Sequence, residues 1–128
     1  MRLLLDTHAL LWALEDAPRL SARARSLLSV PQDAILVSHA SAWEMAIKQS
    51  LGKLSLAEPV TRLMADRLRP LGIALLPISM DHIGLVESLP LHHRDPSDRM
   101  LAAQALVEGL TVVSGDGAFD TYGVARVW

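Results

Sequence analysis

Residues 3 to 8 read Leu3-Leu4-Leu5-Asp6-Thr7-His8, an apolar triplet that runs directly into an acidic residue. Three leucines without polar alternation predict a β-strand buried on both faces, as in a parallel sheet covered by helices. We expect the carboxylate after this strand to be partly buried, and a buried charge is costly unless an opposite charge compensates it. The stretch therefore predicts an α/β fold and a cation at the end of its first strand.

The remainder of the chain alternates between short apolar runs and segments with helical spacing. Strands are predicted at residues 2–5, 34–38, 73–77 and 110–113, with a fifth at 124–127. Helices are predicted at residues 8–14, 22–28, 42–51, 59–68, 80–88 and 96–108. This order indicates one domain over residues 1–128, an α/β fold with a central parallel sheet of four to five strands and helices on both faces.

Composition narrows the classes of function. Hydrophobic residues make up 51% of the 128 residues, yet no apolar run approaches the roughly 18 residues of a membrane span. The N-terminus lacks the features of a secretory signal, so we expect a cytoplasmic protein with no membrane association. There is no cysteine, which excludes disulfides and thiolate metal sites. The net charge of −2 argues against nonspecific coating of nucleic acid, though not against an enzyme that acts on one.

Four acidic residues lie where a predicted strand or loop meets a helix: Asp6, Glu44, Asp98 and Asp116. Right-handed crossovers bring the carboxyl ends of all parallel strands to one edge of a sheet, so we predict that the four face one cavity. Carboxylates that converge without a cationic partner repel one another unless a cation lies between them. The pattern thus indicates a divalent metal site.

Helix capping is an alternative role for some of these acids. Ser41 and Glu44 have the spacing of a capping box, which explains Glu44 as well as catalysis does. Asp95 precedes Pro96 and suits an N-cap better than a site, while Asp98 would also be favourable in a first helical turn. Capping is least able to explain the acid that ends the first strand.

Late in the chain, Asp116 between two glycines is interpreted as a site residue and Asp120 as a turn residue. The predicted ligands are carboxylate oxygens, which favour Mg²⁺, with Mn²⁺ as the alternative, over Zn²⁺. His92 and His93 are interpreted as loop residues and not as zinc ligands. Magnesium sites leave waters for activation and for substrate phosphate, which suits phosphodiester hydrolysis.

Basic and aromatic residues near the acids have simpler interpretations. Lys48 lies one turn after Glu44, which favours an i,i+4 ion pair slightly over substrate contact. Substrate contact stays open for Arg94 and Arg99. Three further side chains are assigned to the core in preference to base stacking: Trp12, Trp43 and Met45.

Four segments, in this order and across almost the whole chain, carry a family resemblance. They are Leu3-Leu4-Leu5-Asp6-Thr7-His8-Ala9-Leu10-Leu11-Trp12, Ser41-Ala42-Trp43-Glu44 through Lys48 with Leu51-Gly52-Lys53-Leu54, His93-Arg94-Asp95-Pro96-Ser97-Asp98-Arg99 and Ser114-Gly115-Asp116. Together they resemble the PIN-domain ribonucleases, and most of all the VapC toxins of bacterial type II toxin–antitoxin systems. One departure is Ser97, where relatives usually carry an aromatic residue, which affects the expected packing beside the site.

The resemblance implies a three-layer PIN-like fold and a Mg²⁺-dependent endoribonuclease whose RNA products carry a 5′-phosphate and a 3′-hydroxyl. It implies that Asp6 and Asp98 bind the metal directly, while Glu44 and Asp116 orient the attacking water or hold a second ion. It also implies a VapB-type antitoxin as partner and a homodimer. We expect the antitoxin to lay an apolar face in a groove between early helices.

Three other interpretations compete. A receiver-like signalling module also binds Mg²⁺ through acids at strand ends, but it needs a phosphoacceptor after its middle strand, and only Asp33 and Asp66 lie between residues 30 and 70. An acid-phosphatase-like hydrolase would have a second aspartate where His8 stands. The last is a catalytically silent PIN-fold binding protein, which the intact set of four acids disfavours.

Overall fold

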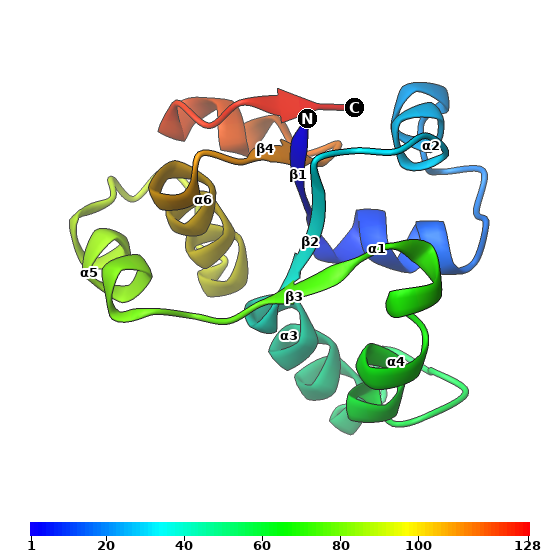
Figure 1. The fold of residues 1–128 in the computed structure, drawn as a ribbon. Helices are drawn as coiled ribbons and strands as arrows, with labels where there is room; N and C mark the ends of the chain where they lie inside the picture. The colour runs from blue at the N-terminus through cyan, green and yellow to red at the C-terminus, as the bar shows by residue number, and fades with distance from the viewer.

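The computed structural model describes all 128 residues and contains one five-stranded parallel sheet with helices on both faces (Figure 1). The strands are β1 (Arg2–Leu5), β2 (Ala34–Ser38), β3 (Ala74–Leu76), β4 (Thr111–Val113) and β5 (Arg126–Val127). The helices are α1 (Thr7–Leu14), α2 (Ala22–Leu28), α3 (His39–Ser50), α4 (Val60–Asp66), α5 (Met80–Ser88) and α6 (Pro96–Glu108), with short 3₁₀ helices η1 (Arg69–Leu71) and η2 (Gly117–Tyr122). The predicted α/β class, with helices on both faces of a parallel sheet, is confirmed.

The leucine triplet forms the centre of the sheet, as the sequence predicts. Leu3, Leu4 and Leu5 are each fully buried. Because side chains alternate along a strand, Leu3 and Leu5 pack into the core beneath α1, α2, α3 and α4, whereas Leu4 packs into a second core with α6 and η2. Figure 1 shows α1 and α2 on one side of the sheet and α6, backed by α5, on the other. The triplet therefore holds the three layers together.

The strand order β3-β2-β1-β4-β5 positions the site. The chain runs outward from β1 through β2 to β3, and then returns to the other side of β1 with β4 and β5. In open parallel sheets, ligands bind in the crevice at the carboxyl ends of the two strands where this direction reverses. Here those strands are β1 and β4. The order also differs from the 2-1-3-4-5 order of receiver-like folds, which removes that alternative.

The sequence-based prediction for the start of α3 is wrong. The helix begins at His39, three residues before the predicted position, because the Ser38 hydroxyl accepts the backbone N–H of Ala40 at 2.9 Å. Ser41 is therefore an internal helical residue, fully buried and without a hydrogen-bond partner for its hydroxyl. Glu44 lies in the second turn of α3 instead of its first, so the capping box predicted for it does not form.

Most other predicted helix ends are confirmed. Ser21 and Ser79 cap α2 and α5 by accepting the amides of Ala24 and His82. Gly109 ends α6 in a left-handed conformation, with φ of 67°. The helix predicted over residues 59–68 is shorter, because α4 ends at Asp66 and η1 follows. No helix in the structure combines the length and the apolar character that crossing a bilayer requires.

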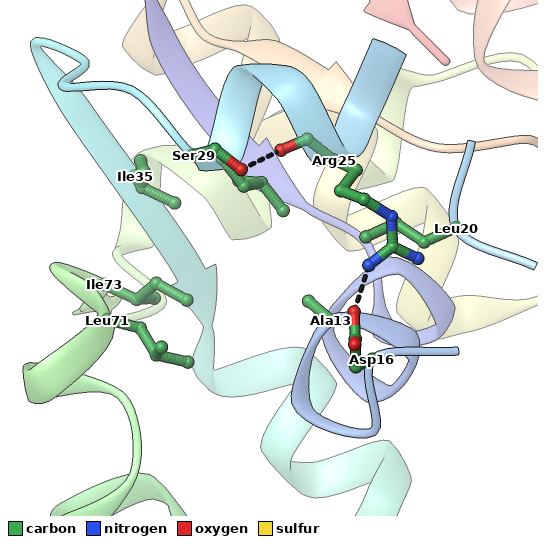
Figure 2. Close-up of a pocket in the computed structure, with 9 residues that line it drawn as sticks. Ala13, Asp16, Leu20, Arg25, Ser29, Ile35, Leu71 and Ile73 are labelled. Atoms are coloured by element: carbon green, nitrogen blue, oxygen red, sulfur yellow. Dashed lines mark hydrogen bonds and ion pairs between the residues drawn. The ribbon is translucent and has the colours of Figure 1, made fainter. Parts of the chain in front are cut away.

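A cavity of about 190 Å³ lies on the α1 and α2 side of the sheet. None of the four acids lines it. Figure 2 shows its apolar wall, with Ile35, Ile73 and Leu71 facing Ala13 and Leu20. Arg25 and Asp16 form an ion pair at its rim. With a single ion pair and an apolar lining, the cavity has no catalytic constellation.

Candidate active site

Asp6 directly follows β1 and begins α1. Its Oδ1 accepts the backbone N–H of Ala9 at 2.8 Å, and its own N–H donates to the carbonyl of Val113 at 3.1 Å, which ties it to the end of β4. The residue is only 6% exposed. Burial raises the pKa of its carboxyl group, although hydrogen bonds from Ser114 and Ala9 partly offset this. A buried carboxylate at the switch point of the sheet is thus present, as the sequence predicts. Asp6 is also the N-cap of α1, so the expectation that capping explains this acid least is wrong.

Glu44 has both carboxylate oxygens engaged. Thr7 donates its hydroxyl to Oε1 at 2.7 Å, and the Lys48 ammonium contacts Oε2 at 2.6 Å. The predicted i,i+4 ion pair is confirmed. Because Thr7 follows Asp6 directly, the first bond joins the start of α1 to the middle of α3. Glu44 is therefore held in one orientation beside the other acids.

Asp98 lies in the first turn of α6, whose N-cap is Asp95. The Asp95 Oδ1 accepts the amides of Ser97 and Asp98 at 2.8 and 3.1 Å, so its assignment as a cap is confirmed. The pKa of Asp98 is raised to about 7, mainly by burial and next by the charge of Asp95. Asp6 and Glu44 raise it further, while His93 lowers it. Three acids from separate elements thus act on one carboxyl group.

Asp116 follows β4 and begins η2, where its Oδ1 accepts the N–H of Ala118 at 2.9 Å. Its Oδ2 lies 3.2 Å from the Nε2 atom of His93, which is also 3.1 Å from Oδ2 of Asp98. The potential ligand atoms of His93, Asp98 and Asp116 all lie within 4.8 Å of one another. By contrast, Asp120 forms a two-point ion pair with Arg126 outside this group.

His93 is the site residue that sequence reasoning missed. Its Nδ1 accepts the N–H of Asp95 at 3.1 Å, so the proton of a neutral ring belongs on Nε2, which faces the two carboxylates. A loop histidine without a metal-ligand spacing gave no signal of its own. Its place at the start of the family-like segment His93 to Arg99, five residues before Asp98, is the signal that could have found it.

The donor set suits a hard divalent cation. No lysine or arginine forms an ion pair with Asp6, Asp98 or Asp116, although burial makes the first two costly to ionise. Carboxylate oxygens that raise one another's pKa without a lysine or arginine partner are those that a bound metal stabilises. The residues present therefore fit a divalent metal cation.

The guanidinium of Arg99, a candidate substrate contact in the sequence, is engaged in hydrogen bonds within the protein. It donates to the carbonyls of Val86, Leu89 and Pro90 and to the Tyr122 hydroxyl, at 2.8 to 3.3 Å. These bonds fasten the end of α5 and the following loop to α6. Ser97 is buried at 4% exposure beside the cap, without the aromatic side chain expected from relatives.

The three side chains predicted to lie in the core differ in their burial. Met45 is fully buried, so its assignment to the core is confirmed. Trp43 is 56% exposed, and the same assignment is wrong for it because α3 turns this side chain outward. Trp12 is half-buried and packs at the edge of the core. A groove of about 460 Å³ lies between α3 and α4 and is lined mainly by apolar side chains.

Comparison with known proteins finds similarity to a ribonuclease over half of the chain. Over 69 residues the chain is 44% identical to the ribonuclease VapC16 of Mycobacterium tuberculosis, a match that covers 51% of this chain and 48% of that protein. The chain thus spans about half the length of this curated relative.

Solved structures resemble the whole chain in fold. The VapBC2 complex of Rickettsia felis with promoter DNA has a TM-score of 0.73 at 16% identity, covering 99% of this chain and 98% of that one. The DNA-bound VapBC of Salmonella typhimurium has a TM-score of 0.70 at 18% identity, covering 99% and 97%. The PIN domain family model matches residues 3–125, from β1 to the residue before β5. On this match and the fold, the chain belongs to the PIN domain family.

Proposed function

We propose that this chain is a divalent-metal-dependent endoribonuclease and the toxin of a type II toxin–antitoxin system. The observation that carries the proposal is the convergence of Asp6, Glu44, Asp98 and Asp116 at the switch point of a PIN-domain sheet. The similarity to a ribonuclease over half the chain supports the same chemistry. An intact set of acids is also what separates an active enzyme from a silent binding protein of this fold.

In this proposal Asp6 and Asp98 hold the cation, with Mg²⁺ preferred and Mn²⁺ as the alternative. When bound, such an ion lowers the pKa of a coordinated water and polarises the scissile phosphate. The fit rests on the two buried carboxyl groups, whose pKa values are raised mainly by burial and which form no ion pair with a lysine or arginine. We expect loss of the metal to abolish cleavage.

Glu44 and Asp116 are assigned to the attacking water. Glu44 is fixed by Thr7 and Lys48, so its oxygens present acceptors in one orientation. The side chain of Asp116 is 45% exposed at the mouth of the site, where it can accept a proton from water that enters with the substrate. Attack on phosphorus with cleavage of the bond to the 3′ oxygen leaves a 5′-phosphate and a 3′-hydroxyl, the products expected for the family.

The partner in this proposal is a VapB-type antitoxin, and the toxin itself is a homodimer. The solved structures of similar fold include VapBC complexes and a toxin–antitoxin complex from Klebsiella pneumoniae. The apolar groove between α3 and α4 supports a protein partner, because large exposed apolar patches mark interaction sites. It also agrees with a partner segment that binds between early helices.

The nuclease is tested with purified protein and total bacterial RNA, in Mg²⁺ and in EDTA. We expect cleavage only with metal, and 5′-phosphate ends on the fragments. Asp6→Asn and Asp98→Asn should each remove cleavage while circular dichroism shows a folded protein. Asp120→Asn is the matched control, since Asp120 pairs with Arg126 outside the site. Cleavage in EDTA, or at the wild-type rate by folded Asp98→Asn, would contradict the proposal.

The toxin role is tested in cells. Induced expression should arrest growth. Co-expression of the protein encoded by the neighbouring upstream reading frame, the expected position of an antitoxin gene, should restore growth, and that protein should co-purify with this chain. Sedimentation of the purified toxin reports the dimer. If active enzyme neither arrests growth nor retains the upstream protein, the ribonuclease assignment stands and the toxin assignment falls.

A further inference from the structure

A pocket of about 400 Å³ opens beside the acidic site and has aromatic walls. Its lining residues are Asp6, His8, Trp12, Arg19, Gly115, Asp116 and Trp128. The volume lies in the range of about 300 to 1,000 Å³ that is typical of sites for small ligands. Since Asp6 and Asp116 line this pocket and also belong to the candidate active site, the two are continuous.

The aromatic rings form a connected group around Trp12. His8 lies one helical turn earlier on α1 and stacks on the indole, with ring centroids 5.4 Å apart and planes 17° from parallel. Trp128 lies against Trp12 at 5.7 Å and a tilt of 54°. The guanidinium of Arg19 is 5.8 Å from the centre of the same ring. Planar surfaces and one cation thus meet within a single pocket.

The loop that carries Asp116 is packed closely on this group. A Cβ atom at Gly115 would lie 3.1 Å from Cε2 and 3.2 Å from Nε1 of Trp128, which is closer than side chains normally approach. A side chain at this position would press on the indole until the ring shifted by a few tenths of an ångström. The position of Trp128 is therefore coupled to the residue just before Asp116.

We propose that this pocket binds a nucleobase of single-stranded RNA next to the scissile phosphate, an inference that rests on the proposed ribonuclease function. Proteins hold unpaired bases by stacking them on aromatic side chains and on arginine planes. Arg19 lines the same pocket as Asp6 and Asp116, so it supplies a cation for the backbone phosphate of that nucleotide. A base explains the rings, the arginine and the continuity with the acids together, whereas a peptide segment explains only the apolar area.

Binding of RNA is measured in the Asp98→Asn background, where cleavage is blocked. The ligand is a single-stranded oligouridine of about 12 nucleotides, long enough to span a site of roughly 4 to 16 nucleotides. Trp12→Leu keeps apolar packing but removes the ring, and Trp12→Tyr keeps an aromatic face. Trp43→Leu is the matched control, because Trp43 is exposed and lies outside this pocket.

We expect Trp12→Leu to weaken RNA binding by about 5- to 150-fold, the range measured for loss of one base stack. Trp12→Tyr should recover most of this loss, and Trp43→Leu should stay within about twofold of the parent. Gly115→Ala, which displaces the Trp128 indole and leaves Trp12 in place, should also weaken binding. Thermal unfolding of each variant shows that the protein is folded.

Photocrosslinking locates the base directly. Oligouridine carrying 5-iodouridine should crosslink to His8, Trp12 or Trp128 on irradiation, as mapped by mass spectrometry. If folded Trp12→Leu binds RNA as tightly as Trp43→Leu and the crosslinks map elsewhere, this inference is wrong while the nuclease remains. If Trp12→Leu loses only the antitoxin, the pocket binds a peptide and the inference is again wrong. If the wild-type protein cleaves no RNA at all, both proposals fall.

Discussion

Thr7 donates its hydroxyl to Glu44 across a distance of 2.7 Å, and this bond links the residue after Asp6 to the second turn of α3. The two residues are 37 positions apart in sequence. Since Lys48 occupies the other oxygen of Glu44, the threonine decides which way the carboxylate faces the remaining acids.

Thr7→Val should therefore lower the rate of RNA cleavage and also cost stability. Loss of one partner of a part-buried hydrogen bond costs about 1 to 3 kcal/mol, and Glu44 would lose its fixed orientation. Thr7→Ser keeps the hydroxyl and serves as the control. Denaturant unfolding and single-turnover cleavage measure the two effects. Equal activity of the valine and serine variants would show that the bond has no part in positioning Glu44.

The raised pKa of Asp98, about 7, makes both stability and activity depend on pH. The folded protein holds this proton more tightly than the unfolded chain, whose carboxyl group titrates near the ordinary value of 3.8. By linkage, the stabilising contribution is fully present below pH 4 and is lost as the pH rises through about 7. Burial and the neighbouring charge of Asp95 are the main causes of the raised pKa.

In EDTA we therefore expect the contribution of Asp98 to the free energy of unfolding to fall as the pH rises from 4 to about 7. This contribution is measured as the difference in unfolding free energy between the wild type and Asp98→Asn, which lacks the titrating proton. Metal binding and cleavage need the ionised carboxylate, so both should rise over the upper part of the same range. Urea unfolding at a series of pH values measures the first effect. A pH-independent difference between the two proteins would contradict the assignment.

Ser38 and Ser41 form a matched pair that tests where α3 begins. Ser38→Ala removes the N-cap and should cost about 0.5 to 2 kcal/mol of stability. Ser41→Ala removes a buried hydroxyl that has no partner, so it should be neutral or slightly stabilising. Urea unfolding compares the two variants directly. A larger loss of stability for Ser41→Ala than for Ser38→Ala would instead support the capping box that the sequence spacing suggests.

This pair also shows how far sequence reasoning reaches. The leucine triplet and the alternation of strands and helices predicted the fold class, because burial on both faces of a parallel sheet leaves a continuous apolar run. The start of α3 was predicted wrongly because two serines, Ser38 and Ser41, each suit a cap locally. Both serines are fully buried, and they differ in their bonding: β2 ends at Ser38, whose hydroxyl accepts the Ala40 amide, whereas the Ser41 hydroxyl has no partner.

Some residues of the candidate site could be predicted from the sequence and others could not. Asp6 and Asp116 could be placed from strand ends alone, since topology brings those ends together. His93 could not, because its position depends on how the loop before α6 folds back. That fold depends on a hydrogen bond from the Asp95 amide to the His93 ring and on one from the His93 amide to the Tyr122 hydroxyl, which no local spacing encodes.

His93 itself yields the last prediction. Its Nε2 lies 3.1 and 3.2 Å from oxygens of Asp98 and Asp116, so its N–H competes with a cation for the same two acceptors. Mg²⁺ prefers oxygen ligands, and we expect the ring to be displaced instead of coordinated. His93→Ala should then tighten Mg²⁺ binding, by about 2- to 10-fold for one hydrogen bond worth roughly 0.5 to 1.5 kcal/mol. Isothermal titration with Mg²⁺ compares the variant with the wild type, and His92→Ala is the neighbouring control. Weaker binding by His93→Ala alone would instead make the imidazole a ligand of the metal.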